Sequence, residues 1–111
     1  MTIQPTRPQK FERTITAQIT VSQLSLAIVH LNELTGSPLT GWTIQENGTM
    51  VAHIGHYFLY RAGRRVGLHQ IHNEQGDIHV VIGSGAKREL YQKLQVYMYG
   101  IREGFALRDN R

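Results

Sequence analysis

The spacing of apolar and polar residues changes along the chain, and each change predicts a different element. In residues 14–21 (TITAQITV) apolar and polar side chains alternate, and most of them are β-branched. A period of two with these residue types is typical of a short strand. Residues 1–12 show almost no apolar periodicity and contain two prolines, which predicts a flexible arm.

A helical period follows the first predicted strand. Thr20 and Gln23 have the spacing of a capping box, and Ser22 is a second candidate for the cap. Gly36 followed by Pro38 predicts the end of this helix. The apolar residues between these signals recur every three or four positions and so share one helix face. They are Leu24, Ala27, Ile28, Leu31 and Leu34.

Turn residues divide the middle of the chain into three predicted hairpins. Asn47-Gly48 is the strongest short hairpin signal, and it separates WTIQ from MVAHI. The tetrapeptide AGRR separates HYFLYR from VGLHQI, and EQG separates QIHN from DIHVVI. Gly76 suits the positive φ that the last of these turns requires.

A second helix is predicted after the segment GSG, with Gly104 as its expected end. Its apolar stripe consists of Leu90, Leu94, Tyr97, Met98 and Ile101. The expected fold class is α+β, a small and mostly antiparallel sheet of four to five strands with two helices packed on one face. We expect a flexible basic arm over 1–12, a single domain over 13–106 and a C-terminal tail over 107–111.

Length and composition narrow the class of protein. A chain of 111 residues, 41% of them hydrophobic, fits one domain with a small core and argues against wholesale disorder. The absence of cysteine excludes disulfides, thiol nucleophiles and cysteine-based zinc sites. The first residues lack the apolar run of a signal peptide, and no stretch approaches 18 apolar residues. We therefore expect a soluble, cytoplasmic protein without a membrane partner.

The net charge of +4 favours polyanionic partners. Val66 to Ile82 contains only Glu74 and Asp77 as charged residues, so the basic charge lies elsewhere in clusters. One cluster is the central hairpin, one is the start of the second helix, and one is the N-terminal arm. Their members are Arg61, Arg64 and Arg65, then Lys87 and Arg88, then Arg7, Lys10 and Arg13.

The glycine-rich bend before the second helix has two interpretations. Gly83 and Gly85 would let a phosphate approach the unpaired N–H groups of the helix start, with Lys87 and Arg88 adding charge. Alternatively, Ser84 caps the helix and the glycines only turn the chain. The segment matches neither the P-loop nor the dinucleotide-binding motif.

Aromatic residues accompany the arginines of the central hairpin. Alternation places Tyr57 and Leu59 on one face of their strand and Phe58 and Tyr60 on the other. If exposed, Phe58 and Tyr60 are candidates for base stacking beside a rim of Arg61, Arg64 and Arg65 that neutralises phosphates. The alternative is that one face belongs to the core and the hairpin tip is merely solvated.

The six histidines raise the question of a metal site. If His72 and Asp77 face each other across their turn, Gln70 pairs with His79, and His72, Asp77 and His79 form a polar cluster. The spacing is looser than that of zinc sites, and solvated strand histidines are the simpler interpretation. We therefore predict no metal and no cofactor. No nucleophile–base–acid arrangement is present either, so the sequence favours a non-catalytic protein.

Several short motifs resemble those of short uncharacterised proteins of bacteriophages and prophages. They are LNELTGSP, GHYFL, LHQIHNEQGDI and KRELYQKLQVYMYGI, and the likeness spans residues 24–101. Residues 1–20 are additional here, and RAGRR replaces the glycine-rich tip of that pattern. The resemblance implies a small phage accessory protein in the cytoplasm of a bacterial host, and it implies no activity or catalytic residues.

The leading functional hypothesis is a phage-type accessory protein that binds a polyanion, with nucleic acid as the first candidate partner. The predicted anion-binding residues are Arg61, Arg64, Arg65, Ser84, Gly85, Lys87 and Arg88, with Phe58 and Tyr60 for stacking. One alternative is an anti-defence inhibitor that binds a host protein. Another is sequestration of a small nucleotide at the GSGAKR bend. A homodimer is a further alternative, because a small sheet exposes its edges.

Overall fold

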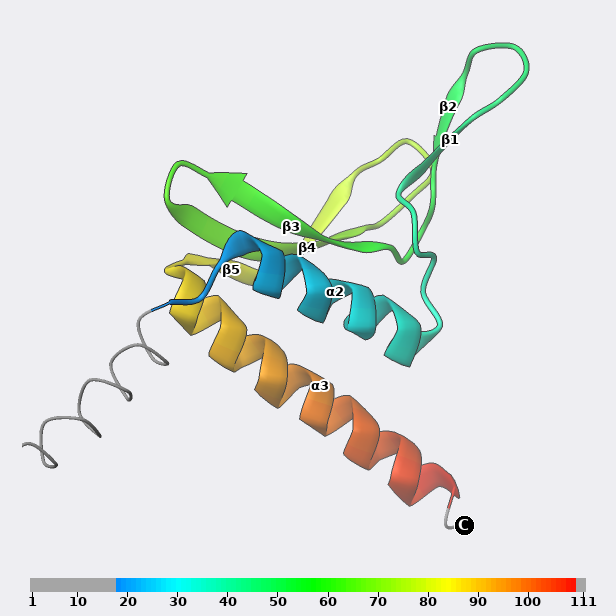
Figure 1. Cartoon of the computed structure of the whole chain (residues 1–111). Helices are drawn as coiled ribbons and strands as arrows, with labels where there is room; N and C mark the ends of the chain where they lie inside the picture. Colours follow the sequence, from blue (N-terminus) through cyan, green and yellow to red (C-terminus); the bar gives the residue numbers. More distant parts are fainter. Residues whose placement is uncertain (1–17, 110–111) are drawn as a thin grey trace, which may run out of the picture.

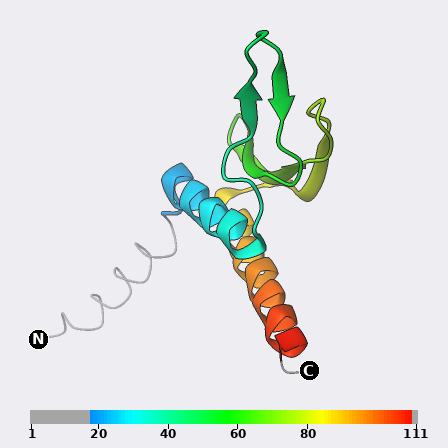
Figure 2. The same cartoon turned by 90° about the vertical axis from the view of Figure 1, so that its right-hand side faces the viewer.

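The computed structural model of the protein describes residues 18–109 (Figure 1). Both helices lie on one face of a three-stranded sheet, and a separate two-stranded hairpin rises on the opposite side (Figures 1 and 2). The α+β class is therefore confirmed, although the five strands within residues 18–109 form two sheets rather than one. The elements are α2 (Val21–Thr35), β1 (Trp42–Ile44), β2 (Met50–Ala52), β3 (Tyr57–Ala62), β4 (Arg65–Ile71), β5 (Ile78–Gly85) and α3 (Lys87–Asp109).

The first predicted strand is wrong where it can be compared with the structure. Residues 14–17 of that strand and the basic arm lie outside the described residues, whereas residues 18–20 have no regular structure and Val21 opens α2. The cause is a complete capping box. The Thr20 hydroxyl accepts from the Gln23 N–H at 3.1 Å, and the Gln23 side chain accepts from the Thr20 N–H at 2.8 Å. This local signal outweighs the period-two pattern.

Helix α2 packs on the sheet through the stripe that the sequence predicted. Leu24, Ala27, Ile28 and Leu31 are buried in the main core. The helix ends at Gly36, whose φ of 70° places it in the left-handed region and whose N–H reaches back to the last turn.

The three-stranded sheet is antiparallel throughout, with β4 in the centre. Its inner face meets the helices through Tyr57, Val66 and Leu68, which are buried. Its outer face points away from the helices and carries Phe58 and Tyr60. The hairpins predicted around AGRR and EQG are confirmed, with Gly63 and Gly76 at positive φ in their turns.

Helix α3 covers the same sheet face and completes the core with Leu90, Leu94 and Met98. The expected end at Gly104 is wrong, because the helix continues to Asp109. A single exposed glycine costs a helix only about 1 kcal/mol, and favourable residues follow it. Phe105 and Arg108 also contact each other one turn apart, with the guanidinium 4.8 Å from the ring centroid.

The β1–β2 hairpin, predicted from Asn47-Gly48, is anchored at its base to the β4–β5 turn. The Ala52 N–H donates to Glu74 O at 3.1 Å. The Trp42 indole lies directly on Gly76, where a Cβ atom would approach the ring to 2.5 Å. These contacts hold the hairpin upright beside the outer face of the three-stranded sheet (Figure 2).

Candidate nucleic-acid interface

The register of the sheet brings the two basic segments of the described chain together. Val66 of β4 pairs with Gly85 of β5, so the β3–β4 turn lies beside the start of α3. Arg65 Nη2 also donates to Ser84 O at 2.7 Å across this junction. The basic end of the sheet, as we call it, contains all the predicted anion-binding residues: Arg61, Arg64, Arg65, Ser84, Gly85, Lys87 and Arg88.

Charge is unevenly distributed along the sheet. Arg61, Arg64 and Arg65 are all exposed at the basic end. Glu74 and Asp77 lie in the β4–β5 turn at the opposite end. An extended polyanion along the sheet would therefore meet its most favourable electrostatic potential at the β3–β4 turn.

The start of α3 differs from the interpretation in which Ser84 caps the helix. Ser84 does not cap the helix, because it belongs to β5, and the first helical bond runs from Leu90 N to Ala86 O at 3.0 Å. The Glu89 carboxylate accepts from the Ala86 N–H at 3.0 Å. The chain thus supplies its own anion to the helix start, in the position that a capping-box carboxylate takes. Lys87 and Arg88 remain available through their side chains.

A row of aromatic rings occupies the outer face next to the basic end. Phe58 and Tyr60 project from β3 on this face, as alternation predicted. His69 of β4 lies between them, with its ring stacked on Tyr60 at 4.3 Å between centroids and edge-on to Phe58 at 5.7 Å. Tyr60 keeps 38% of its surface exposed. The outer face therefore presents aromatic surface to solvent within one strand of the arginines.

His69 was not singled out by sequence reasoning, although its place follows from the turn. Counting outward from the two-residue turn Gly63-Arg64 pairs Phe58 with His69. The side chain is 9% exposed, and its Nδ1 has no hydrogen-bond partner among the described residues. Burial lowers the pKa of His69 below its ordinary value of 6.5, which favours the neutral ring that stacks as an aromatic side chain.

A groove of about 390 Å³ extends the row to the base of the β1–β2 hairpin. Trp42, Phe58, Ile71 and Ile78 supply most of its apolar walls. His56 lines it too, with its ring nearly parallel to Phe58 and its Nδ1 2.8 Å from Pro38 O. The sequence did not predict this groove, because it depends on how the hairpin sits on the sheet.

The histidine cluster does not form a recognisable metal centre. The register does pair Gln70 with His79, and the His72 N–H donates to Asp77 O at 2.7 Å. The Asp77 carboxylate, however, accepts from the Asn73 amide at 2.7 Å. Across residues 18–109, no three His, Asp or Glu side chains lie close enough together to hold a metal ion.

No protein family model, curated protein or solved structure matches this chain. The resemblance to phage proteins stays a prediction. Neither of the two described helices combines the length and the hydropathy that crossing a bilayer requires.

Proposed function

We propose that the protein binds single-stranded nucleic acid across the outer face of its three-stranded sheet, as a non-catalytic accessory protein of phage type. The observation that carries the proposal is the row of Phe58, His69 and Tyr60 beside the exposed arginines of the basic end. Open sheet faces with aromatic side chains are a recurring platform for unpaired bases.

Each part of the interface has a separate physical role. Phe58 and Tyr60 are alternate residues of one strand and project from the same face about 7 Å apart along the backbone. His69 stacks on one face of the Tyr60 ring, so a base would stack on the part of Tyr60 that stays exposed. Stacking contributes about 1–3 kcal/mol per base and depends little on sequence. Arg64 and Arg65 at the β3–β4 turn neutralise phosphates, which makes the affinity depend on salt.

Paired bases fit this surface less well. In a duplex the flat faces of the bases are covered by their neighbours, so stacking on Tyr60 would require unstacking. The nucleotide-sequestration alternative is also disfavoured, because the Glu89 carboxylate bonded to Ala86 N would repel a phosphate at the helix start. The single-stranded polymer is the ligand that uses both the rings and the arginines.

The test is fluorescence anisotropy with labelled single- and double-stranded oligonucleotides at two salt concentrations. We expect tighter binding of the single strand and a marked loss of affinity at the higher salt. Tyr60→Ala should weaken single-strand binding by roughly 5- to 150-fold, the equivalent of about 1–3 kcal/mol of stacking. Arg64→Glu should weaken binding and reduce its salt dependence.

The matched control for Arg64→Glu is Arg102→Glu, the same charge change at an exposed position of α3 away from the basic end. It should leave affinity close to that of the wild type. Absence of detectable binding at low salt would contradict the proposal. A pull-down from host lysate after nuclease treatment would then test the alternative of a host protein partner.

A further inference from the structure

The two edge strands of the three-stranded sheet differ in whether their outward backbone groups have hydrogen-bond partners. On the β3 edge, Asn32 of α2 uses its buried side-chain amide like a neighbouring strand. Its Nδ2 donates to Tyr57 O at 3.0 Å, and its Oδ1 accepts from Tyr57 N at 2.9 Å. In the part of the chain that the structure describes, β5 pairs only with β4, so its other side is a free edge.

Strand β5 has no charged or proline residue to protect its free edge, although its pairing with β4 contains two register shifts. Its eight residues, Ile78–Gly85, contain no proline and no Asp, Glu, Lys or Arg. Natural proteins blunt exposed edges with charges, prolines or very short strands, because an unprotected edge pairs readily with another strand. An uncharged edge of this length points to pairing with a further strand.

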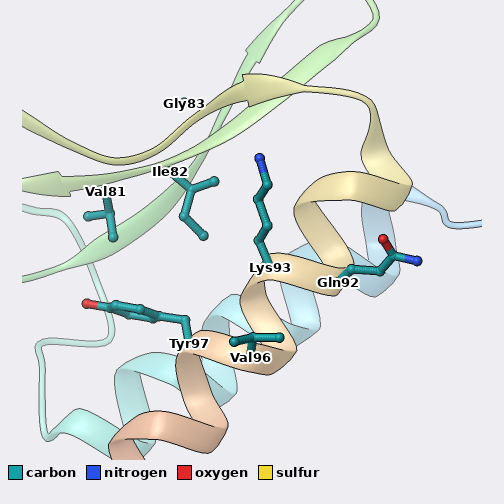
Figure 3. Close-up of a pocket in the computed structure, with 7 residues that line it drawn as sticks. All are labelled: Val81, Ile82, Gly83, Gln92, Lys93, Val96 and Tyr97. Atoms are coloured by element: carbon teal, nitrogen blue, oxygen red, sulfur yellow. The ribbon is translucent and has the colours of Figure 1, made fainter.

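A groove runs along this edge between β5 and α3 (Figure 3). Val81, Ile82 and Gly83 form its upper wall, and residues of α3 form its floor. Val96 on the floor is 72% exposed, which is unusual for a valine beside a sheet. Lys93 stands up from α3 toward β5, with its ammonium group between the two elements (Figure 3).

The groove continues along one stripe of α3. The residues of this stripe are ordered so that two antiparallel copies of it would complement each other. Lys93, Val96, Gly100 and Glu103 follow helical spacing, and all four are exposed. A Cβ atom on Gly100 would meet nothing within 4 Å, so this position is open to another helix. When two such stripes run in opposite directions, Val96 of each copy falls beside Gly100 of the other, and Lys93 falls beside Glu103.

We propose that a second copy of this chain occupies the groove, with β5 pairing antiparallel to β5 across a two-fold axis and the two α3 helices packing below. Charge complementarity favours a second copy as the occupant. An antiparallel copy of the same stripe places Glu103 opposite Lys93 and the small residue Gly100 opposite Val96. Strands lie about 4.8 Å apart, so pairing of the edges brings the helices beneath them toward contact distance. The result is a continuous six-stranded sheet with an isologous interface.

Sedimentation velocity on the full chain at increasing protein concentration tests the proposal. The wild type should sediment with twice the 12.6-kDa mass of the chain. Val96→Glu should raise the dissociation constant at least about tenfold, because it buries a carboxylate at the helix contact. Since Val96 is largely exposed in the single chain, the variant should fold, and circular dichroism verifies this.

A charge exchange separates the specific interface from general loss of stability. Lys93→Glu alone should weaken the dimer by placing two carboxylates together. Adding Glu103→Lys should restore association, because the pair is reversed but complementary. Val29→Glu, an equivalent change at an exposed valine of α2, should remain dimeric. A wild type that stays monomeric at every concentration overturns the proposal, as does a charge exchange that fails to restore association.

Discussion

Asn32 does with one side chain what a neighbouring strand would do with its backbone. The residue is 2% exposed, and both of its amide atoms bond to the backbone of Tyr57. It lies next to Leu31 on the buried side of α2, so the signal in the sequence is a polar residue bordering an apolar helical stripe. That signal shows only that the residue is unusual. Its partner, 25 positions away, depends on the packing of α2 against β3.

Replacing Asn32 with leucine should therefore destabilise the protein although the two side chains are similar in size. The change leaves the Tyr57 N–H and carbonyl buried without partners, which costs about 1–3 kcal/mol in the free energy of unfolding. Urea denaturation followed by circular dichroism measures the loss, and Glu33→Gln at the neighbouring exposed position serves as the control. An unchanged midpoint in Asn32→Leu would mean that these two hydrogen bonds contribute nothing net.

His69 should make the stability of the protein depend on pH. Burial lowers the pKa of His69 in the folded state below 6.5, and unfolding restores the ordinary value. The unfolded chain thus binds a proton that the folded chain does not, so the free energy of unfolding falls as pH decreases through about 6.5. Tyr60, stacked on the ring, is the titratable side chain that faces it.

The prediction is checked by chemical denaturation at a series of pH values on either side of 6.5. His69→Gln should lose less stability on acidification than the wild type, because it lacks the group that gains a proton on unfolding. His30→Gln, which removes an exposed histidine of α2 and retains His69, should behave like the wild type. Parallel pH profiles for His69→Gln and the wild type would assign the acid sensitivity to other groups.

At the scale of elements, the most reliable predictions rest on residues whose local geometry leaves few options. Asn47-Gly48, Gly63 and Gly76 mark turns that form where expected, because positive φ is accessible to glycine at little cost. The capping box of Thr20 and Gln23 likewise forms as the sequence indicates. The predictions of Ser84 as a cap and Gly104 as a helix end are wrong, because neighbouring segments decide both. Ser84 is held in β5 beside β4, and Phe105 and Arg108 continue α3.

The candidate interface could be predicted only in part for the same reason. The clusters of arginines and the alternation of Phe58 with Tyr60 are readable directly from the order of residues. The arginines come close to Lys87 and Arg88 only because Val66 pairs with Gly85. This pair follows from an irregular register between β4 and β5. The groove beside Trp42 depends on how the β1–β2 hairpin packs against Gly76. The spacing of apolar residues in the sequence does not reveal this packing.

At the scale of the whole molecule, the two proposals combine into one arrangement. Pairing of β5 with β5 would join two outer faces into a single sheet, with two aromatic rows and two basic ends. A nucleic-acid strand long enough to reach both aromatic rows could bind the second row while it stays bound to the first. The geometry of the dimer would set the effective concentration for this second contact. A short strand that covers one row would gain nothing from the second copy.

Length dependence therefore distinguishes a dimeric binder from a monomeric one. Residue 96 does not belong to the outer face of the sheet. The Val96→Glu variant should therefore bind a short oligonucleotide with the same affinity as the wild type. For a long oligonucleotide the wild type should bind about 10²-fold more tightly than this variant, because only the dimer engages both rows. Anisotropy titrations of the two proteins against matched short and long strands give the comparison. Equal ratios of affinity at both lengths would show that each copy binds independently, whatever its oligomeric state.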